Sequence, residues 1–374
     1  MGGGQSTRGD GTRLFAAGLV AAFVLLVLGT AAAAAHGGRA PAAPPPPTPV
    51  LARLVAPAPL PPPEPPTTAA PRVTKRVVRK ASPTTTAAPT TTTSTTQPPA
   101  PLPTPGPGIP QGKGVWVWEP ARSDGGNVVQ MVNRAKGVGL SHIFVRTGSS
   151  WDGFNGGPFL AQLLPVAHAA GLKVYGWDFP KLEDVDADVK RGLAAIDFST
   201  AHGDRIDGFA ADIETPSEGT RLTVHAVQLY GSVLRGRAGP KELLIAAVPR
   251  PSQQMLARYP YADVVAPFDA IAPMIYWLNR EPGGDTADAM VYLDRFHKPL
   301  LPIGQAYDGG PEGGRPGVPR RAELLRFMEV AKQYDAAAVS FWSWQAANGE
   351  AWDAIRDGAN FLRPPPAEKK PSDG

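Results

Sequence analysis

Asp212 and Glu214 are the residues whose types and spacing are best suited to chemistry. They end the run Asp-Gly-Phe-Ala-Ala-Asp-Ile-Glu (207–214), which is short and mostly apolar, as expected for a buried β-strand. Side chains alternate along a strand, so Ala210, Asp212 and Glu214 share one face, with the Cα atoms of the two acids about 6.5 to 7 Å apart. At this spacing one carboxylate can raise the pKa of the other and keep it protonated as a general acid near neutral pH.

Eight strand–helix units are expected to hold this pair. After Gly112, short apolar runs alternate with longer amphipathic segments, which is typical of βαβ units, and eight parallel strands close a (β/α)₈ TIM barrel. An open doubly wound sheet would need a glycine loop after its first strand, which residues 117–120 do not provide. The predicted strands are 114–118, 142–147, 172–178, 208–214, 243–248, 270–277, 300–305 and 339–344. The predicted helices are 127–136, 158–170, 186–202, 222–237, 286–296, 321–334 and 350–361, with a short one near 252–258.

The carboxyl ends of the strands carry the chemistry in such a barrel. In this sequence they combine carboxylates with aromatic rings, and a sugar stacks its apolar faces on Trp or Tyr while its hydroxyls bond to polar side chains. This composition favours a carbohydrate ligand. Besides the two acids, the strand-end candidates are Trp118, Glu119, Arg146, Trp177, Asp178, Tyr276, Trp277, Trp344 and Gln345.

A structural role for the acidic pair is the alternative interpretation. Asp212 and Glu214 would then pair with Arg146 or cap the following helix. Inward-facing acids at the end of a central barrel strand rarely serve packing alone, so we favour the functional interpretation.

The run 207–214 resembles the Asp-Gly-x-Asp-x-Asp-x-Glu signature of family 18 glycoside hydrolases, the chitinase-like barrels. Met274-Ile275-Tyr276 is similar to that family's Met-x-Tyr, and Trp342 or Trp344 stands where the family has a floor tryptophan. The resemblance implies that Glu214 protonates the leaving oxygen. Asp212 would orient the substrate's N-acetyl group as an internal nucleophile, and Tyr276 would steady the oxazolinium. This chemistry requires a 2-acetamido sugar.

A second resemblance is to the family 25 lysozyme-like muramidases. Ala210 stands where the family 18 signature has its first inward Asp, and residues 145–149 lack the Ser-x-Gly-Gly of that family. Family 25 has an Asp-x-Glu without the earlier Asp, and its second and third strands look like residues 143–146 and 169–176. Its members use an Asp on the first strand, where this sequence has Glu119. Both families cut β-linked amino-sugar polymers.

Composition excludes several other classes of site. The sequence has no cysteine, and its six histidines are scattered without metal-ligand spacing, so we expect no metal and no cofactor. The net charge of +4 combines +7 in residues 1–112 with −3 in the remainder. The barrel region therefore gives no electrostatic reason to expect nucleic acid.

The N-terminal third of the sequence differs in kind from the rest. Arg8 and Arg13 precede an apolar run at 14–35, so residues 1–36 are expected to be a cleaved signal peptide or a retained transmembrane anchor. Residues 37–112, rich in Pro, Thr and Ala, are expected to form a disordered linker, and 364–374 a disordered tail. The folded domain is then 113–363, held outside the cytoplasm as a secreted or membrane-anchored protein of the cell envelope.

The leading hypothesis is an exported glycoside hydrolase that acts on an N-acetylhexosamine polysaccharide, such as peptidoglycan or a chitin-like polymer, as a monomer. One alternative is a non-catalytic glycan-binding barrel, in which Ala210 marks loss of the mechanism while the aromatic residues still stack on sugar. Another is a hydrolase of neutral glucans that uses Asp178 with Glu214.

Overall fold

Eight parallel strands form a closed barrel in the computed structural model, which describes residues 108–362. Closure comes from β1 (Gly112–Val117), which pairs in parallel with the last strand, β9 (Ala338–Trp342), and with β2 (His142–Ser149). The short β3 (Gly153–Phe154) pairs antiparallel with the end of β2. The other strands, in order around the barrel, are β4 (Lys173–Phe179), β5 (Gly208–Asp212), β6 (Leu244–Pro249), β7 (Ala270–Ile275) and β8 (Ile303–Gln305).

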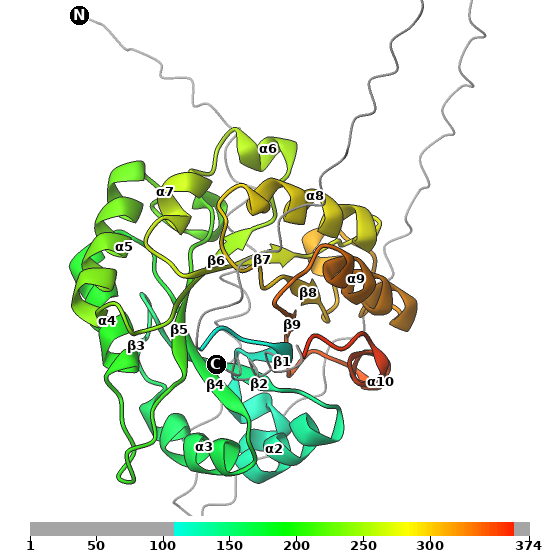
Figure 1. Cartoon of the computed structure of the whole chain (residues 1–374), viewed down its shortest axis with the longest axis horizontal. Coiled ribbons are helices and arrows are strands. Elements are labelled where there is room, and N and C mark those ends of the chain that lie inside the picture. The colour runs from blue at the N-terminus through cyan, green and yellow to red at the C-terminus, as the bar shows by residue number, and fades with distance from the viewer. Residues whose placement is uncertain (1–107, 363–374) are drawn as a thin grey trace, which may run out of the picture. The chain divides into compact units, whose positions relative to one another are not determined.

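Helices surround the barrel, as Figure 1 shows. The α-helices are α2 (Val128–Gly137), α3 (Gly157–Ala169), α4 (Val185–Ile196), α5 (Val224–Ala238), α6 (Gln253–Leu256), α7 (Tyr261–Val265), α8 (Pro282–Asp294), α9 (Arg321–Gln333) and α10 (Gly349–Asp357). The 3₁₀-helices are η1 (Pro120–Arg122), η2 (Asp124–Gly126), η3 (Pro216–Glu218) and η4 (Gly310–Glu312). The predicted (β/α)₈ barrel is therefore confirmed for the described residues.

Two predicted helices differ from the observed ones for local reasons. The helix predicted at 186–202 ends at Ile196, because Thr200 Oγ1 accepts hydrogen bonds from the backbone of His202 and Asp204 and closes a turn instead. The helix predicted from 286 begins at Pro282, where the Glu281 carboxylate caps the next two amides. The short helix predicted near 252–258 is confirmed as α6, and α7 follows it as a separate helix that was not predicted.

The barrel lumen is filled by aromatic side chains. Trp116 stacks on Phe144 with ring centroids 4.3 Å apart, and Phe144 stacks on Tyr175 at 5.1 Å. Trp177 lies above them in the same buried cluster, 5.6 Å from Trp116. A second cluster fills the layer between the sheet and the helices. The lumen is thus a packed core, and ligands are left to the strand ends.

The described part of the predicted linker lies against the barrel. The Tyr175 hydroxyl donates a hydrogen bond of 3.0 Å to the carbonyl oxygen of Gly108, and Ile109 packs against the lumen cluster. Residues 1–36, most of 37–112 and 364–374 lie outside the described residues. Between residues 108 and 362, no helix has the length and apolarity needed to cross a membrane.

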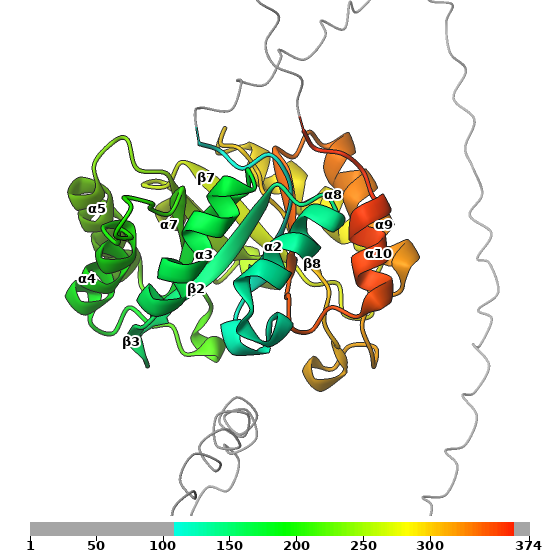
Figure 2. The same ribbon diagram turned by 90° about the horizontal axis from the view of Figure 1, so that it is seen from below.

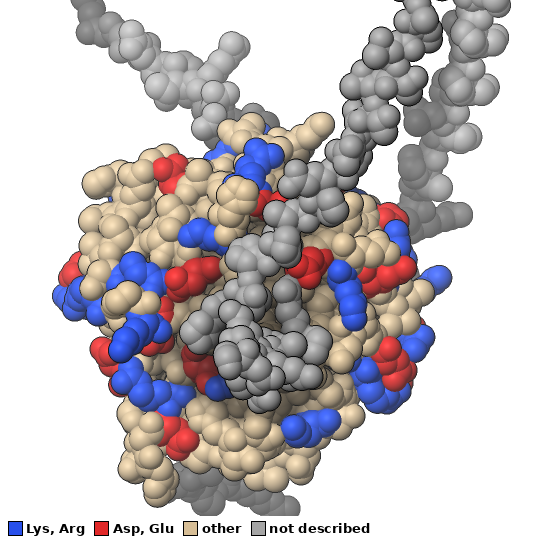
Figure 3. Space-filling view, viewed as in Figure 1, with Lys and Arg blue, Asp and Glu red and all other residues tan. Residues whose placement is uncertain are grey.

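The β2–β3 hairpin marks the carboxyl-end face of the barrel. It projects from one edge in Figure 2, opposite the edge at which the chain enters β1. On the face seen in Figure 3, Lys and Arg side chains are interspersed with Asp and Glu around the visible rim. That face therefore carries no broad patch of a single sign outside the area covered by grey atoms.

Two glycines of α5 test how tightly the helical layer packs. A Cβ atom on Gly231 would lie 2.3 Å from Cγ of Pro267, whereas one on Gly236 would meet nothing within 4 Å. In an open helical position Ala is favoured over Gly by about 1 kcal/mol, and forcing an extra methyl into a packed core costs about 1 to 3 kcal/mol.

We therefore expect opposite effects from the same substitution in one helix. Gly231→Ala should lower the free energy of unfolding by about 1 to 2 kcal/mol, and Gly236→Ala should raise it by about 0.5 to 1 kcal/mol. Urea denaturation followed by tryptophan fluorescence measures both. Equal changes in the two variants would contradict the close approach of α5 to Pro267.

Candidate active site

The strand predicted at 208–214 ends at Asp212, so β5 carries Asp212, and Glu214 follows two residues beyond it. Ala210 lies in the lumen cluster, whereas Phe209 and Ile213 lie in the layer beneath the helices, so Asp212 shares the inward face. The backbone at Ile213 is held on both sides: its amide donates to the Ala247 carbonyl at 3.0 Å, and its carbonyl accepts from the Tyr259 hydroxyl at 2.6 Å. The peptide between the two acids is therefore fixed by hydrogen bonds.

Asp212 is a buried carboxyl group without a positive partner. Asp212 is only 8% exposed, and its Oδ1 atom has no hydrogen-bond partner within residues 108–362. Burial, and then the charges of Asp178 and Glu218, raise the pKa of Asp212 to about 7. The group is thus held ready to keep a proton near neutral pH.

Glu214 is half-buried next to it. Burial, followed by the negative charges of Asp212 and Glu218, raises the pKa of Glu214 well above its usual value. Desolvation and like charges raise this pKa, whereas a backbone hydrogen bond at Thr215 lowers it. A protonated carboxyl group at this position can act as a general acid.

Other residues pair with Arg146 and cap the following helix, which are the two structural roles considered for Asp212 and Glu214. The Arg146 guanidinium is bound by Asp152 and by Ser149, whose Oγ lies 3.0 Å from Arg146 Nη2. The following helix, α5, is capped by the Thr223 hydroxyl, which accepts from an amide of its first turn at 3.1 Å. Neither arginine pairing nor helix capping therefore explains the acids.

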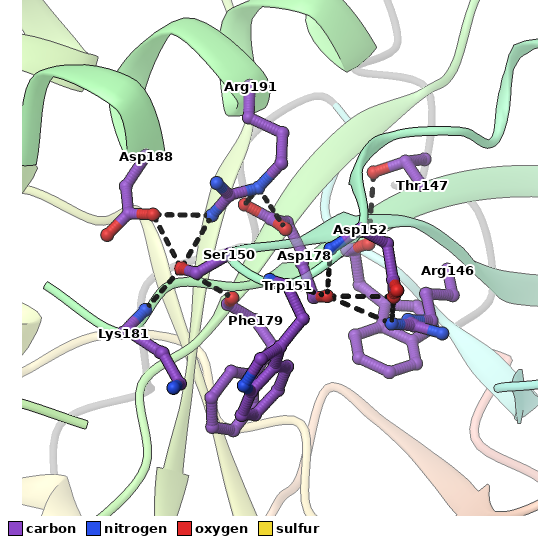
Figure 4. Close-up of polar contacts among 12 residues, drawn as sticks. Arg146, Thr147, Ser150, Trp151, Asp152, Asp178, Phe179, Lys181, Asp188 and Arg191 are labelled. Atoms are coloured by element: carbon purple, nitrogen blue, oxygen red, sulfur yellow. Dashed lines mark hydrogen bonds and ion pairs between the residues drawn. The ribbon is translucent and has the colours of Figure 1, made fainter. Parts of the chain in front are cut away.

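Asp178, predicted to contact a ligand, instead faces the helical layer. Its carboxylate is fully buried and accepts hydrogen bonds of 2.9 and 3.0 Å from Nε of Arg191 on α4 (Figure 4). Burial raises the pKa of Asp178 to about 6, against the hydrogen bonds and charge of Arg191. Because its neighbour Trp177 points into the lumen, Asp178 points away from it.

Trp342 lies among the other tryptophans above the lumen. Its ring meets Trp177 edge-on at 5.4 Å and lies 6.2 Å from Trp116. Trp118 stacks beside it at 6.1 Å and is 38% exposed, so it offers ring area to a ligand. Met274 packs in the same buried cluster. Four of the candidate ligand-contacting residues therefore come together at one end of the barrel.

Tyr276 connects the acids to residues that the sequence did not single out. Its ring meets Tyr307 edge-on at 5.4 Å, and the Tyr307 hydroxyl donates to Glu312 at 2.7 Å. Burial, Tyr307 and the two acids raise the pKa of Tyr276 well above its usual value, so its hydroxyl stays protonated. Tyr307 lies two residues beyond β8, and this position near a strand end could have identified it from the sequence. Glu312 lies in a glycine-rich loop, and no sequence pattern pointed to it.

Two predicted ligand contacts are corrected because the side chains face the helices. Trp277 is fully buried in the outer layer against Phe327, with ring centroids 5.8 Å apart. Trp344 packs against Trp352 at 5.0 Å, and its Nε1 donates to Asp124 at 3.1 Å. Neither ring is available at the lumen.

The remaining candidates lie at the edge of the strand ends. Glu119 forms an ion pair with Arg122 at 3.2 Å. Gln345 lines an open hollow of about 260 Å³ together with Arg122, and its buried Oε1 atom has no partner in the described part of the chain. Residues 108–362 contain no group of three or more His, Asp and Glu side chains arranged to hold a metal ion.

Comparison with known proteins finds similar backbones and no close relative. No protein-family model and no curated protein matches the chain. An endo-1,4-β-mannanase from Rhizomucor miehei is 11% identical over 62% of this chain and 86% of that chain, with a TM-score of 0.48. A class V chitininase from Pseudomonas fluorescens Pf-5 is 13% identical over 67% and 99%, at 0.45. A chitinase from Chromobacterium violaceum is 12% identical over 66% and 98%, at 0.47.

Neutralising Asp212 should change how stability depends on pH. In the folded protein its pKa is about 7, above that of an unfolded Asp near 4, so the folded state holds the extra proton in between. Stability then falls as pH rises through this window, by about 1.4 kcal/mol for each unit at most. Removing the charge of Asp212 also relieves Glu214, which acts in the same direction.

We therefore expect Asp212→Asn to be increasingly more stable than the parent protein between pH 4 and pH 7. The difference between the two should be smallest at pH 4 and should grow as the pH rises to 7. Guanidinium denaturation at a series of pH values measures it. A difference that stays constant across the series would show that Asp212 ionises normally in the folded protein.

Proposed function

We propose that the protein is a glycoside hydrolase that cleaves a polysaccharide containing N-acetylhexosamine, of the peptidoglycan or chitin type, with Glu214 as general acid. The observation that carries the proposal is the pair of acids at and just beyond the end of β5, both with pKa values raised by burial and neither with a cationic partner among the described residues. A general acid has to be protonated near the working pH, and this environment favours that form.

The roles of the other residues follow from their positions. Glu214 donates its proton to the glycosidic oxygen as the bond to the anomeric carbon breaks. The acetamido oxygen of the same sugar closes onto that carbon. Asp212, in the ionised form that it reaches as the pH rises above about 7, orients the acetamido group and balances its developing positive charge. The Tyr276 hydroxyl, held in its protonated form, donates to the resulting ring. Water then opens this ring while Glu214 takes back a proton.

The aromatic residues support a sugar as ligand. Trp342 and the exposed ring of Trp118 lie side by side at the strand ends, and apolar ring faces of a pyranose pack on such surfaces. Met274 and Trp177 form the buried layer that supports them. Export belongs to the same proposal, because a polysaccharide of the cell envelope lies outside the cytoplasm and the apolar run at 14–35 has the order of a secretory signal.

A glycan-binding barrel without turnover is the second candidate, and Ala210 favours it. Its methyl group fills the lumen below Asp212, so the chain supplies no side chain from that position to share the proton of Asp212. The substrate or Glu214 has to fill this role during turnover. Without a side chain at position 210 to share its proton, Asp212 would be less well oriented, which would leave glycan binding intact and slow the reaction.

Glu214→Gln should lower kcat by about 10²- to 10⁴-fold and change KM by less than about twofold, because the amide keeps the shape of the acid but cannot donate its proton to the leaving oxygen. Release of reducing ends from peptidoglycan strands and from N-acetylglucosamine oligomers measures it. Glu329→Gln, on the exposed side of α9, is the matched control and should leave both constants unchanged.

Three other outcomes separate the alternatives. Undiminished turnover in Glu214→Gln would end the assignment of the general acid. Tight binding of these glycans by the parent protein with no turnover would favour the glycan-binding barrel. Turnover of glucans that lack amino sugars would remove the requirement for an acetamido group.

A further inference from the structure

The β2–β3 hairpin presents one large aromatic residue to solvent beside the candidate active site. Trp151 lies at its tip and is 56% exposed. Its ring stacks on Phe179 at the end of β4, with centroids 4.9 Å apart and planes 23° apart. Figure 4 shows the two rings side by side below the polar network of the hairpin. An aromatic residue exposed to this degree is a candidate contact surface.

The hairpin is fixed by partly buried hydrogen bonds. The Ser150 hydroxyl donates to Asp188 at 2.6 Å and accepts from the Lys181 amide at 2.7 Å and from Arg191 at 3.2 Å (Figure 4). The hairpin also depends on Gly148, where a Cβ atom would lie 2.4 Å from the carbonyl oxygen of the facing strand. Trp151 is therefore a pre-positioned ring, and its binding costs little conformational entropy.

Trp151 lies close to the loop that follows Asp212 and Glu214 in the sequence. A Cβ atom on Gly219 would lie 4.0 Å from the Trp151 ring and 3.7 Å from the Lys181 side chain. Gly219 directly follows Glu218, whose charge acts on both Asp212 and Glu214. A polymer bound at the acids can thus extend onto Trp151.

Lys181 adds a positive charge to this ring. Its Nζ atom lies 4.6 Å from the centroid of Trp151. In the described part of the chain it has no carboxylate partner, whereas the neighbouring Arg146 and Arg191 are held by Asp152 and Asp178. The surface therefore combines apolar ring area with an uncompensated ammonium group.

We propose that Trp151 and Lys181 form a subsite for an acidic amino-sugar unit of the polysaccharide, one whose substituent carries a carboxylate. This inference rests on the proposed function and narrows its substrate class to anionic glycan strands of the peptidoglycan type. The sugar ring packs on Trp151, and the carboxylate, on a lactyl ether or an attached peptide, pairs with Lys181. Neutral chitin-like chains would use only the aromatic part.

The charge preference gives the subsite a measurable signature. An exposed ion pair contributes about 0.2 to 1 kcal/mol, which corresponds to a change of about 1.4- to fivefold in affinity. The contribution is screened by salt. Loss of the ring removes stacking for both kinds of chain, and we expect about a fivefold or larger loss of affinity from it.

The experiment compares Lys181→Gln and Trp151→Ala with the parent protein on two substrates. One is a peptide-free glycan strand with free lactyl carboxylates, and the other is a neutral N-acetylglucosamine oligomer of similar length. Lys181→Gln should raise KM about two- to fivefold for the acidic strand alone, leave kcat unchanged, and lose this effect at high salt. Trp151→Ala should raise KM for both. Lys190→Gln, which removes an exposed charge from α4, is the control and should change neither.

An equal effect of Lys181→Gln on the acidic and the neutral substrates, or no effect on acidic strands either with or without their peptides, would overturn the subsite while leaving the hydrolase intact. If the effect appears only with strands that keep their peptides, the recognised carboxylate is that of the peptide. Calorimetric binding of the same two glycans to the parent and to Lys181→Gln tests the subsite independently of turnover. If no glycan is cleaved but acidic strands still bind the parent protein more tightly than Lys181→Gln, the proposed function fails and the subsite stands.

Discussion

The removal of Asp212 and Glu214 from water without a positive partner is the constraint that the rest of the structure has to satisfy. A buried carboxyl group with an unpartnered oxygen costs several kcal/mol in its charged form, and this cost raises the pKa of Asp212 to about 7. The buried acids Asp178 and Asp188, by contrast, share Arg191. The absence of such a cation at β5 is therefore a local property of the site, and the packed lumen and helical layer have to offset its cost.

Barrel closure supplies the geometry that makes this possible. Because β1 joins β9 to β2, every strand has two neighbours and its alternate side chains are committed to the lumen or to the helices. Asp212 lies directly above the filled lumen, so it cannot retreat into the barrel, and the Tyr259 hydroxyl holds the carbonyl of Ile213 so that the peptide cannot turn the acids outward.

The sequence predicted the barrel well because parallel strands buried on both faces appear as uninterrupted apolar runs. Predictions for single residues failed where the inward–outward alternation of side chains was not applied to every residue of a strand. Trp177 points inward, so its neighbour Asp178 had to point outward, and the same reasoning from Tyr276 places Trp277 outward. Trp344 could not be assigned in this way, because β9 ends at Trp342 and the chain turns. The β2–β3 hairpin depends on side-chain contacts and has too few residues to show a pattern.

The two acids and the exposed Trp151–Lys181 surface belong to different parts of this fold. Asp212 ends β5, Glu214 follows two residues later, and the raised pKa values of both depend on burial. Trp151 and Lys181 stand on peripheral loops, and no interaction between Lys181 and either acid contributes to those pKa values. Substitutions at Trp151 and Lys181 can therefore alter this surface without altering the burial that raises the pKa values of the acids. In barrels of this type the loops at the strand ends can be exchanged while the residues on the strands are retained.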